Sequence, residues 1–261
     1  MKLGIVIPLK SKCISKDWEI TTRSLSATLN SIQHQTSPLF SVAVAGHQVP
    51  TDMVENYPNV RFVSVDFPVP DPSAPNFSHK RLIDDKNMKL AHAMLALADS
   101  GITHWYALDS DDLVSTDFVE TVLQSVSGYS GALLEGGYFL YHDIKRAIRT
   151  EEMTQYCGST SVLADEDIEI PRVPSLENIK SIPWSNYSHM NISEFFTRET
   201  QKPFTIIKKP ILGYVLSSGD NISDRWRDNW WKVAKAKIKP FIKGKKYSPS
   251  LLQSFSMNNL K

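Results

Sequence analysis

Cysteine is scarce in this chain: Cys13 and Cys157 are the two cysteines among 261 residues. They form no disulfide framework and do not show the spacing of a metal-ligand pair. This usage fits a reduced compartment, and we expect a cytoplasmic protein.

The sequence also lacks long apolar runs and a strong charge. Residues 3–9 are apolar but too few to span a bilayer, and they lack the charged-apolar-small order of a signal peptide. The net charge of +1 gives no overall field that would favour nucleic acid or an acidic partner. The remaining composition, 41% hydrophobic and 22% charged, is that of a globular protein with one large domain or two small ones.

Apolar periodicity predicts alternating strands and helices. We expect strands at residues 2–9, 40–45, 60–65 and 105–108, helices at 18–35, 86–99 and 116–126, and strand-rich segments at 131–141, 156–163 and 205–216. Four prolines within residues 67–76 indicate a loop. This order predicts an α/β fold with a mostly parallel central sheet flanked by helices.

Three carboxylates directly follow the apolar run at residues 105–108: Asp109, Asp111 and Asp112. Because side chains alternate along a strand, Asp109 and Asp111 would project to the same side at its end. Ligands of open α/β sheets lie beyond the carboxyl ends of the strands, and Mg²⁺ and Mn²⁺ prefer oxygen ligands. A solvated acidic turn that caps the next helix is the alternative. The position favours a metal site.

Four segments in this order resemble the glycosyltransferases of the GT-A fold, and among them family 2. They are Ile5-Val-Ile-Pro8, Ser31-Ile-Gln-His-Gln-Thr36, Lys86 with Lys89, and Trp105-Tyr-Ala-Leu-Asp-Ser-Asp-Asp112. The resemblance covers residues 1–125. It implies a nucleotide-sugar donor, a hydroxyl acceptor, and a divalent metal, Mn²⁺ or Mg²⁺, that joins the donor diphosphate to the carboxylates.

The resemblance also assigns residues to these roles. Pro8 and Leu9 would line the nucleotide pocket, and Lys86 or Lys89 would face the diphosphate. The donor would also contact Asp109, Ser110 and Asp111, and the metal would be held by Asp109, Asp111 and Asp112. One position departs from the family, which commonly has an acidic residue after the second strand to hold the base. This chain has Ala45-Gly-His-Gln48 there, so the base is left open.

The second half of the chain must supply a base for the acceptor hydroxyl, usually Asp, Glu or His. Candidates are Asp165, Glu166 and Asp167 in one acidic segment, together with His189 and Glu194. Glu194 and His189 are preferred. Gly158 lies in a segment that resembles the strand beneath the donor sugar, where glycine would allow close backbone approach; a plain turn is the alternative.

Residues 225–246 contain nine Lys or Arg and one acid, Asp228, with Trp226, Trp230 and Trp231 interleaved. This pattern is typical of a helix at a membrane interface. It equally describes an amphipathic helix that packs its aromatic side on the catalytic domain. A nucleic-acid site is disfavoured because the rest of the chain is neutral.

We therefore expect one GT-A domain at residues 1–224, with a nucleotide-sugar half at 1–115 and an acceptor half at 116–224, followed by a basic helical extension at 225–261. The enzyme would be an inverting, metal-dependent glycosyltransferase acting on a cell-envelope glycan or lipid-linked saccharide, with peripheral contact to the inner face of the membrane. A nucleotidyltransferase is one alternative, although Pro8-Leu-Lys-Ser-Lys-Cys13 lacks the glycines of a phosphate loop. A non-catalytic GT-A-like binding module at a membrane surface is the other.

Overall fold

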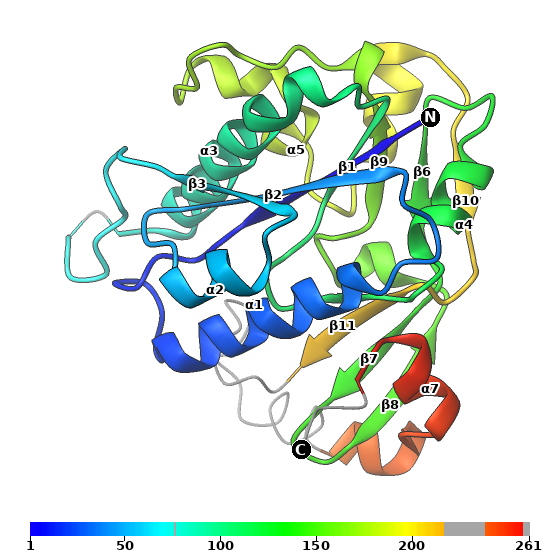
Figure 1. Ribbon diagram of the computed structural model, residues 1–261. Coiled ribbons are helices and arrows are strands. Elements are labelled where there is room, and N and C mark those ends of the chain that lie inside the picture. The colour runs from blue at the N-terminus through cyan, green and yellow to red at the C-terminus, as the bar shows by residue number, and fades with distance from the viewer. Residues whose placement is uncertain (76, 217–237, 258–261) are drawn as a thin grey trace.

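A computed structural model describes residues 1–75, 77–216 and 238–257, and two β-sheets organise them (Figure 1). The larger sheet has seven strands in the order β10-β6-β9-β4-β1-β2-β3. Their bounds are β1 Leu3–Pro8, β2 Phe40–Gly46, β3 Val60–Ser64, β4 His104–Ala107, β6 Gly131–Leu134, β9 Ser161–Ala164 and β10 Thr205–Ile207. Among these described strands only β9 runs antiparallel to its neighbours. The predicted α/β fold with a largely parallel sheet is confirmed.

Helices cover both faces of this sheet. Figure 1 shows α1 (Trp18–Gln33) and α2 (Thr51–Asn56) on one face and α3 (His79–Leu97) and α5 (Pro183–Asn186) on the other. The alternation along β1 explains this: Ile5 packs in the cluster that includes α1, while Val6 packs against α3. Since both faces are covered, every residue of β1 is buried. Burial of a side chain such as Ile5 contributes about 1.5–3 kcal/mol.

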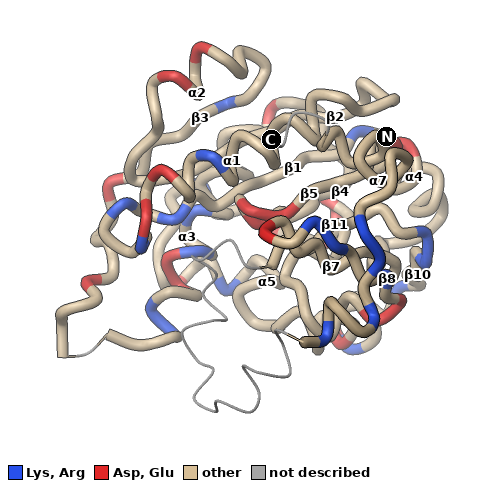
Figure 2. Tube along the Cα trace, turned by 90° about the horizontal axis from the view of Figure 1, so that it is seen from below, with Lys and Arg blue, Asp and Glu red and all other residues tan. Residues whose placement is uncertain are grey.

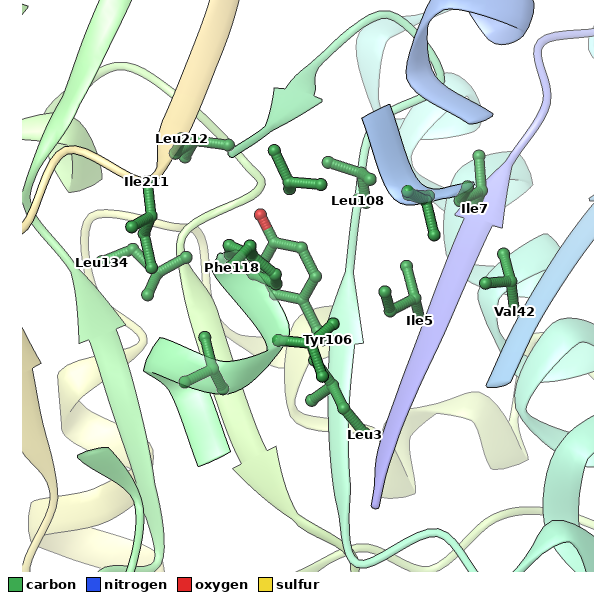
Figure 3. Packing of buried hydrophobic residues seen from close by; sticks show 14 of the residues in the cluster. Leu3, Ile5, Ile7, Val42, Tyr106, Leu108, Phe118, Leu134, Ile211 and Leu212 are labelled. Atoms are coloured by element: carbon green, nitrogen blue, oxygen red, sulfur yellow. The ribbon is translucent and has the colours of Figure 1, made fainter. Parts of the chain in front are cut away.

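The first of these clusters continues beneath β4 (Figure 3). Tyr106 of β4 packs its ring against Phe118, the first residue of α4 (Phe118–Ser125), with ring centroids 4.7 Å apart. The Tyr106 hydroxyl donates to the carbonyl of Ser159 at 2.8 Å. These contacts hold the end of β4, and with it the acidic motif, against β9.

Helix α3 begins earlier than the sequence predicted. The expected start was residue 86, whereas the helix starts at His79 with Ser78 as its N-cap, whose hydroxyl accepts from the Arg81 amide. The reason lies in Asp85, which is polar yet buried on the helix face that the apolar residues share. A buried carboxylate interrupts the apolar periodicity, so the pattern conceals the first two turns.

The smaller sheet has five strands in the order β12-β8-β7-β11-β5. Their bounds are β5 Leu113–Val114, β7 Gly137–Tyr141, β8 Arg146–Thr150, β11 Leu212–Leu216 and β12 Lys245–Lys246. The strand-rich segments at 131–141 and 205–216 thus each supply one strand to each sheet. The two segments are in close contact where each passes from one sheet to the other. A Cβ added to Gly136 would lie 2.2 Å from the Lys208 carbonyl oxygen, so this position has no room for a side chain.

The C-terminal part of the described chain packs on the smaller sheet. Residues 238–243 are helical, and α7 (Pro249–Ser254) carries Leu251 into a cluster with Phe255, Leu140 and Val215. Residues 225–237, the larger part of the predicted basic segment at 225–246, lie outside the described residues. Within residues 1–75, 77–216 and 238–257, no helix has both the length and the hydropathy to cross a bilayer.

Short helical turns connect the remaining elements. Within the described part of the chain, 3₁₀ turns lie at Ala98–Ser100, Met153–Gln155, Asp165–Asp167 and Asn178–Ser181, and a π turn lies at Phe195–Thr200.

Candidate active site

A cavity of about 310 Å³ opens at the carboxyl ends of β1 and β4. Its walls come from the loop after β1, from α1, α3 and β11, and from the acidic motif after β4. The lining residues that matter for chemistry are Pro8, Leu9, Lys10, Asp85, Lys86, Lys89, Asp109, Ser110, Asp111, Gly158 and His189. In open α/β sheets this edge is where ligands bind. Figure 2 shows the acidic stretch that precedes β5 near the middle of the molecule.

Asp109 and Asp111 both line this cavity, and so does Ser110 between them, because the strand ends at Ala107 and the motif forms a turn. The Lys86 ammonium lies 2.5 Å from Asp109 Oδ1 and forms an ion pair with it. Gly158 closes over this pair, because a Cβ there would lie 3.1 Å from both Lys86 Nζ and Asp109 Oδ2. The Gly158 backbone thus closely approaches the ion pair, and its predicted approach to a donor sugar stays a prediction.

The carboxylates repel each other in this half-buried position. Burial and the Asp109 carboxylate raise the pKa of Asp111 to about 6. Burial lowers the pKa of Lys86, but Asp109 raises it more strongly together with other nearby acidic groups, so that the ammonium stays charged. The site therefore favours additional positive charge beside Asp111.

Asp109 and Asp111 could bind a divalent cation together with waters and substrate oxygens. The described residues do not form a complete coordination shell of protein ligands. Within the part of the chain that the structure describes, no group of three or more His, Cys, Asp or Glu side chains is arranged to hold a metal ion. Asp109 already holds a cation, the Lys86 ammonium, at ligand-like distance. Mg²⁺ is commonly held by one or two carboxylates together with waters and substrate phosphates. Two carboxylates in an open cavity meet that requirement.

Asp112, expected as a third metal ligand, does not line the cavity. Its side chain is completely buried, and it accepts hydrogen bonds from Ser159 Oγ at 2.7 Å, Cys157 Sγ at 3.1 Å and the Val215 amide at 3.3 Å. Ser159 Oγ in turn accepts from the Asp109 amide at 2.9 Å. Asp112 is thus placed to hold the loop that carries Asp109.

The two lysines of α3 have different partners. Lys86 reaches the acidic motif, whereas Lys89 is 1% exposed and pairs with Asp85 Oδ2 at 2.6 Å. Both line the cavity, which agrees with their three-residue spacing on one helix face. Sequence reasoning missed Asp85, because its position appeared to precede the helix.

Of the candidate bases, the structure brings only His189 into the cavity within the described residues. Its Nδ1 lies 2.6 Å from the Thr154 carbonyl oxygen. A carbonyl can only accept, so Nδ1 carries the proton and Nε2 is left as an acceptor. Glu194 instead pairs with Arg198 at 2.7 Å and is not part of the cavity wall.

The acidic segment at 165–167 lies away from the cavity. Asp165 accepts from the Trp105 indole at 2.6 Å. Glu166 and Asp167 both pair with Lys202 at 2.6 Å. These contacts tie β4, β9 and the segment before β10 together, which is a structural role.

Comparison with solved structures identifies the class of fold. Residues 1–349 of S. aureus TarS in complex with UDP-GlcNAc superpose with a TM-score of 0.50 at 13% identity, covering 98% of this chain and 71% of that one. Another TarS 1–349 structure gives a TM-score of 0.46 at 13% identity and covers 82% of this chain. There the match spans 60% of the TarS chain.

A manganese complex of Rv0371c from Mycobacterium tuberculosis superposes with a TM-score of 0.42 at 11% identity, covering 86% of this chain and 96% of that one. No protein-family model matches the sequence, and the search of curated proteins gave no match. The chain has the fold of the GT-A-like glycosyltransferases.

Proposed function

We propose that this protein is a glycosyltransferase that moves a sugar from a nucleotide-sugar donor to a hydroxyl acceptor. The observation that carries the proposal is the cavity at the strand ends, which is lined by Asp111, His189 and the ion pair of Lys86 with Asp109. The ammonium can stabilise the negative charge of a diphosphate leaving group, and the two carboxylates can bind the divalent cation that accompanies it. The solved TarS complexes with UDP and UDP-GlcNAc support a nucleotide-sugar as donor.

In this proposal Asp109 and Asp111 hold a divalent cation, Mn²⁺ or Mg²⁺. When bound, that cation supplies Lewis-acid stabilisation of the departing diphosphate. The Lys86 ammonium contributes a second positive charge near the same oxygens. Pro8 and Leu9 line the wall against which the nucleoside lies, and Ser110 lies between the two carboxylates in the motif.

The transfer step uses His189 as the general base. The acceptor oxygen forms a bond to the anomeric carbon while the bond from that carbon to the diphosphate oxygen breaks. The hydroxyl proton passes to His189 Nε2, and the bonding electrons leave with the nucleoside diphosphate. The Nδ1 hydrogen bond to Thr154 fixes the ring so that Nε2 is available. A single displacement of this kind inverts the anomeric centre.

The acceptor is proposed to be a cell-envelope glycan or a lipid-linked saccharide, as in polysaccharide biosynthesis. A cytoplasmic enzyme would reach such an acceptor by peripheral membrane contact through the basic residues of 225–246. Liposome flotation with anionic lipid tests this point: intact protein that stays with the soluble fraction at low salt would refute the membrane contact.

Release of nucleoside diphosphate from a panel of nucleotide-sugars, with and without Mn²⁺, tests the main proposal. We expect Mn²⁺ to stimulate release, and Asp111→Asn to lower it at least about 100-fold while the fold is retained, since a charge-assisted contact is lost. Asp99→Asn, an exposed change in the 3₁₀ turn Ala98–Ser100 that follows α3, is the matched control. Metal-stimulated release that survives Asp109→Asn and Asp111→Asn would refute the proposed site.

The role of His189 has its own test. His189→Gln should lower the rate of transfer to acceptor by about 100-fold or more, while the affinity for the nucleoside diphosphate stays within about twofold of the unmodified protein. His34→Gln, at the exposed end of α1, is the control. An unchanged transfer rate in His189→Gln would exclude it as the base.

A further inference from the structure

Residues 154–158 border the cavity and touch both parts of the proposed site. At one end of this segment, the Thr154 carbonyl oxygen accepts from His189 Nδ1 at 2.6 Å. At the other end, a Cβ added to Gly158 would lie 3.1 Å from the lysine and from the carboxylate of the ion pair. Tyr156 stands midway between them. Because two residues span at most about 7 Å, its backbone is close both to the candidate base and to the ion pair.

Tyr156 is 47% exposed, although its ring belongs to an aromatic cluster. The ring meets that of Phe139 edge-on, with centroids 5.1 Å apart, and Phe139 lies 6.1 Å from the ring of Tyr214. Phe139 is a core residue of β7, whereas Tyr214 of β11 lines the cavity. A single exposed tyrosine is ordinary on a protein surface. This one is held by the core on one side and stands between the two reacting parts of the site.

A lysine from the C-terminal part of the chain shows which groups these rings attract. Lys239 Nζ lies 5.1 Å from the centre of the Phe139 ring and 5.8 Å from that of Tyr156. The face of an aromatic ring carries negative partial charge, so it attracts ammonium groups and other positively polarised hydrogens. Such a contact is weak where it is exposed, and Lys239 is exposed. Its flexible side chain can therefore give way to a ligand that covers more of the ring.

A pyranose sugar is the kind of acceptor that suits an exposed aromatic ring at this place. In its chair form, the six-membered ring presents several C–H bonds on one face, and their hydrogens carry positive partial charge. These hydrogens complement the negative face of a tyrosine ring, while the hydroxyl groups at the edge of the sugar stay in water. Covering the two apolar faces also removes them from water. An open-chain polyol has the same hydroxyl groups but no rigid C–H face, so it gains little from the tyrosine.

We propose that Tyr156 binds the acceptor and that the acceptor unit at the transfer site is a pyranose sugar. This inference rests on the proposed function, in which His189 takes the proton of the acceptor hydroxyl. The sugar stacks on the exposed part of the Tyr156 ring, which brings one of its hydroxyl groups between His189 and the donor. The nucleoside is assigned to the wall at Pro8 and Leu9, so it does not compete for Tyr156. Tyr156 is a binding residue and takes no part in the proton transfer.

Saturation-transfer NMR on the unmodified protein tests the contact directly. The probes are the methyl pyranosides of glucose, galactose, mannose and N-acetylglucosamine, with sorbitol as the open-chain comparison. Saturating the aromatic protons of the protein should transfer magnetisation to the C–H protons on one face of at least one pyranoside, and not to sorbitol. No transfer to any of the four pyranosides, or equal transfer to sorbitol, would overturn the inference.

Three variants assign the contact to the ring of Tyr156. Tyr156→Leu keeps an apolar side chain against Phe139 but removes the aromatic face, and it should weaken pyranoside binding about 3- to 10-fold. Tyr156→Phe keeps the face and should stay within about twofold of the unmodified protein. Tyr129→Leu is the matched control, because Tyr129 is 44% exposed and is not part of the cavity wall. Equal weakening in Tyr156→Phe and Tyr156→Leu, or none in Tyr156→Leu, contradicts the proposal.

Kinetics separate acceptor binding from a merely structural role. With the pyranoside that binds, Tyr156→Leu should raise the KM for this acceptor about 3- to 10-fold, while kcat and the affinity for nucleoside diphosphate stay within about twofold. A structural role would instead lower thermal stability and nucleoside diphosphate affinity together. If the unmodified protein releases no nucleoside diphosphate from any nucleotide-sugar, the proposed function fails. If release occurs but Tyr156→Leu leaves pyranoside binding unchanged, the inference alone is refuted.

Discussion

Replacing Asp112 by alanine separates a structural role of this carboxylate from the metal-ligand role that its place in the motif suggested. The change removes the acceptor of three buried donors: Ser159 Oγ, Cys157 Sγ and the Val215 amide. A buried donor without an acceptor costs about 1–3 kcal/mol. The thiol is a weak donor, so Ser159 and Val215 dominate. We expect the free energy of unfolding to fall by about 2–5 kcal/mol, a large share of the about 5–15 kcal/mol typical of a domain.

Asp112→Asn should be milder than Asp112→Ala. Burial and the carboxylates of Asp111 and Asp109 raise the pKa of Asp112 well above its usual range, so the charge itself is costly. Asparagine keeps one acceptor and the shape, and the Ser159 hydroxyl can turn to accept from the new amide. We expect a loss of about 1–2 kcal/mol.

Urea unfolding followed by tryptophan fluorescence measures these differences, because Trp105 is completely buried. Asp99→Ala, an exposed substitution, should stay within about 0.5 kcal/mol of the unmodified protein. If Asp112→Ala also stays within about 0.5 kcal/mol yet abolishes Mn²⁺ binding, Asp112 is a metal ligand and the reasoning from its buried hydrogen bonds is refuted.

Three further predictions concern the lysine, the glycine and a buried histidine. Lys86→Gln should weaken nucleoside diphosphate binding about 10- to 100-fold, and exposed Lys80→Gln should not; equal effects would exclude a specific role. Gly158→Ala should lower donor affinity several-fold with a small change in thermal stability, because its Cβ crowds Lys86 and Asp109 at 3.1 Å; unchanged affinity would show that the pair can move. Burial lowers the pKa of His104 in the folded protein. As the pH falls below about 6.5, this histidine is therefore protonated in the unfolded chain before it is protonated in the folded protein, and protonation lowers the free energy of unfolding below that pH. His104→Gln should therefore show a smaller fall in unfolding free energy between pH 7 and pH 5, and an identical slope would contradict it.

Local sequence patterns predicted most of the secondary structure and the position of the acidic motif in the site. The run at 2–9 became β1, which is buried on both faces and therefore apolar throughout. The runs at 40–45 and 60–65 became β2 and the edge strand β3, where Arg61 and Ser64 are exposed. The acidic motif lies at the carboxyl end of β4, and Asp109 and Asp111 both line the cavity there. Strand alternation gives no information on a third carboxylate beyond the strand, and the chain turns there so that Asp112 points into the protein.

Long-range contacts decided what the patterns could not. Glu194 and His189 are close in sequence and were equal candidates, but only His189 reaches the cavity, where Thr154 orients its ring. Asp85 precedes the helix predicted at 86–99, whereas α3 begins at His79 and includes it. Its partner His47 lies 38 positions away in the chain and approaches it through the packing of α3 on β2.

The sequence by itself determined the order of strands and helices and the position of an acidic motif at the end of a strand, because these depend on residue type and local period. Tertiary structure decided which charged groups meet, because ion pairs and buried acceptors form between segments that packing brings together. Asp109 with Lys86, Asp112 with Ser159, and Asp85 with Lys89 and His47 all belong to this second class. The roles proposed for Asp109, Lys86 and Asp112 follow from burial and partners that no single segment contains.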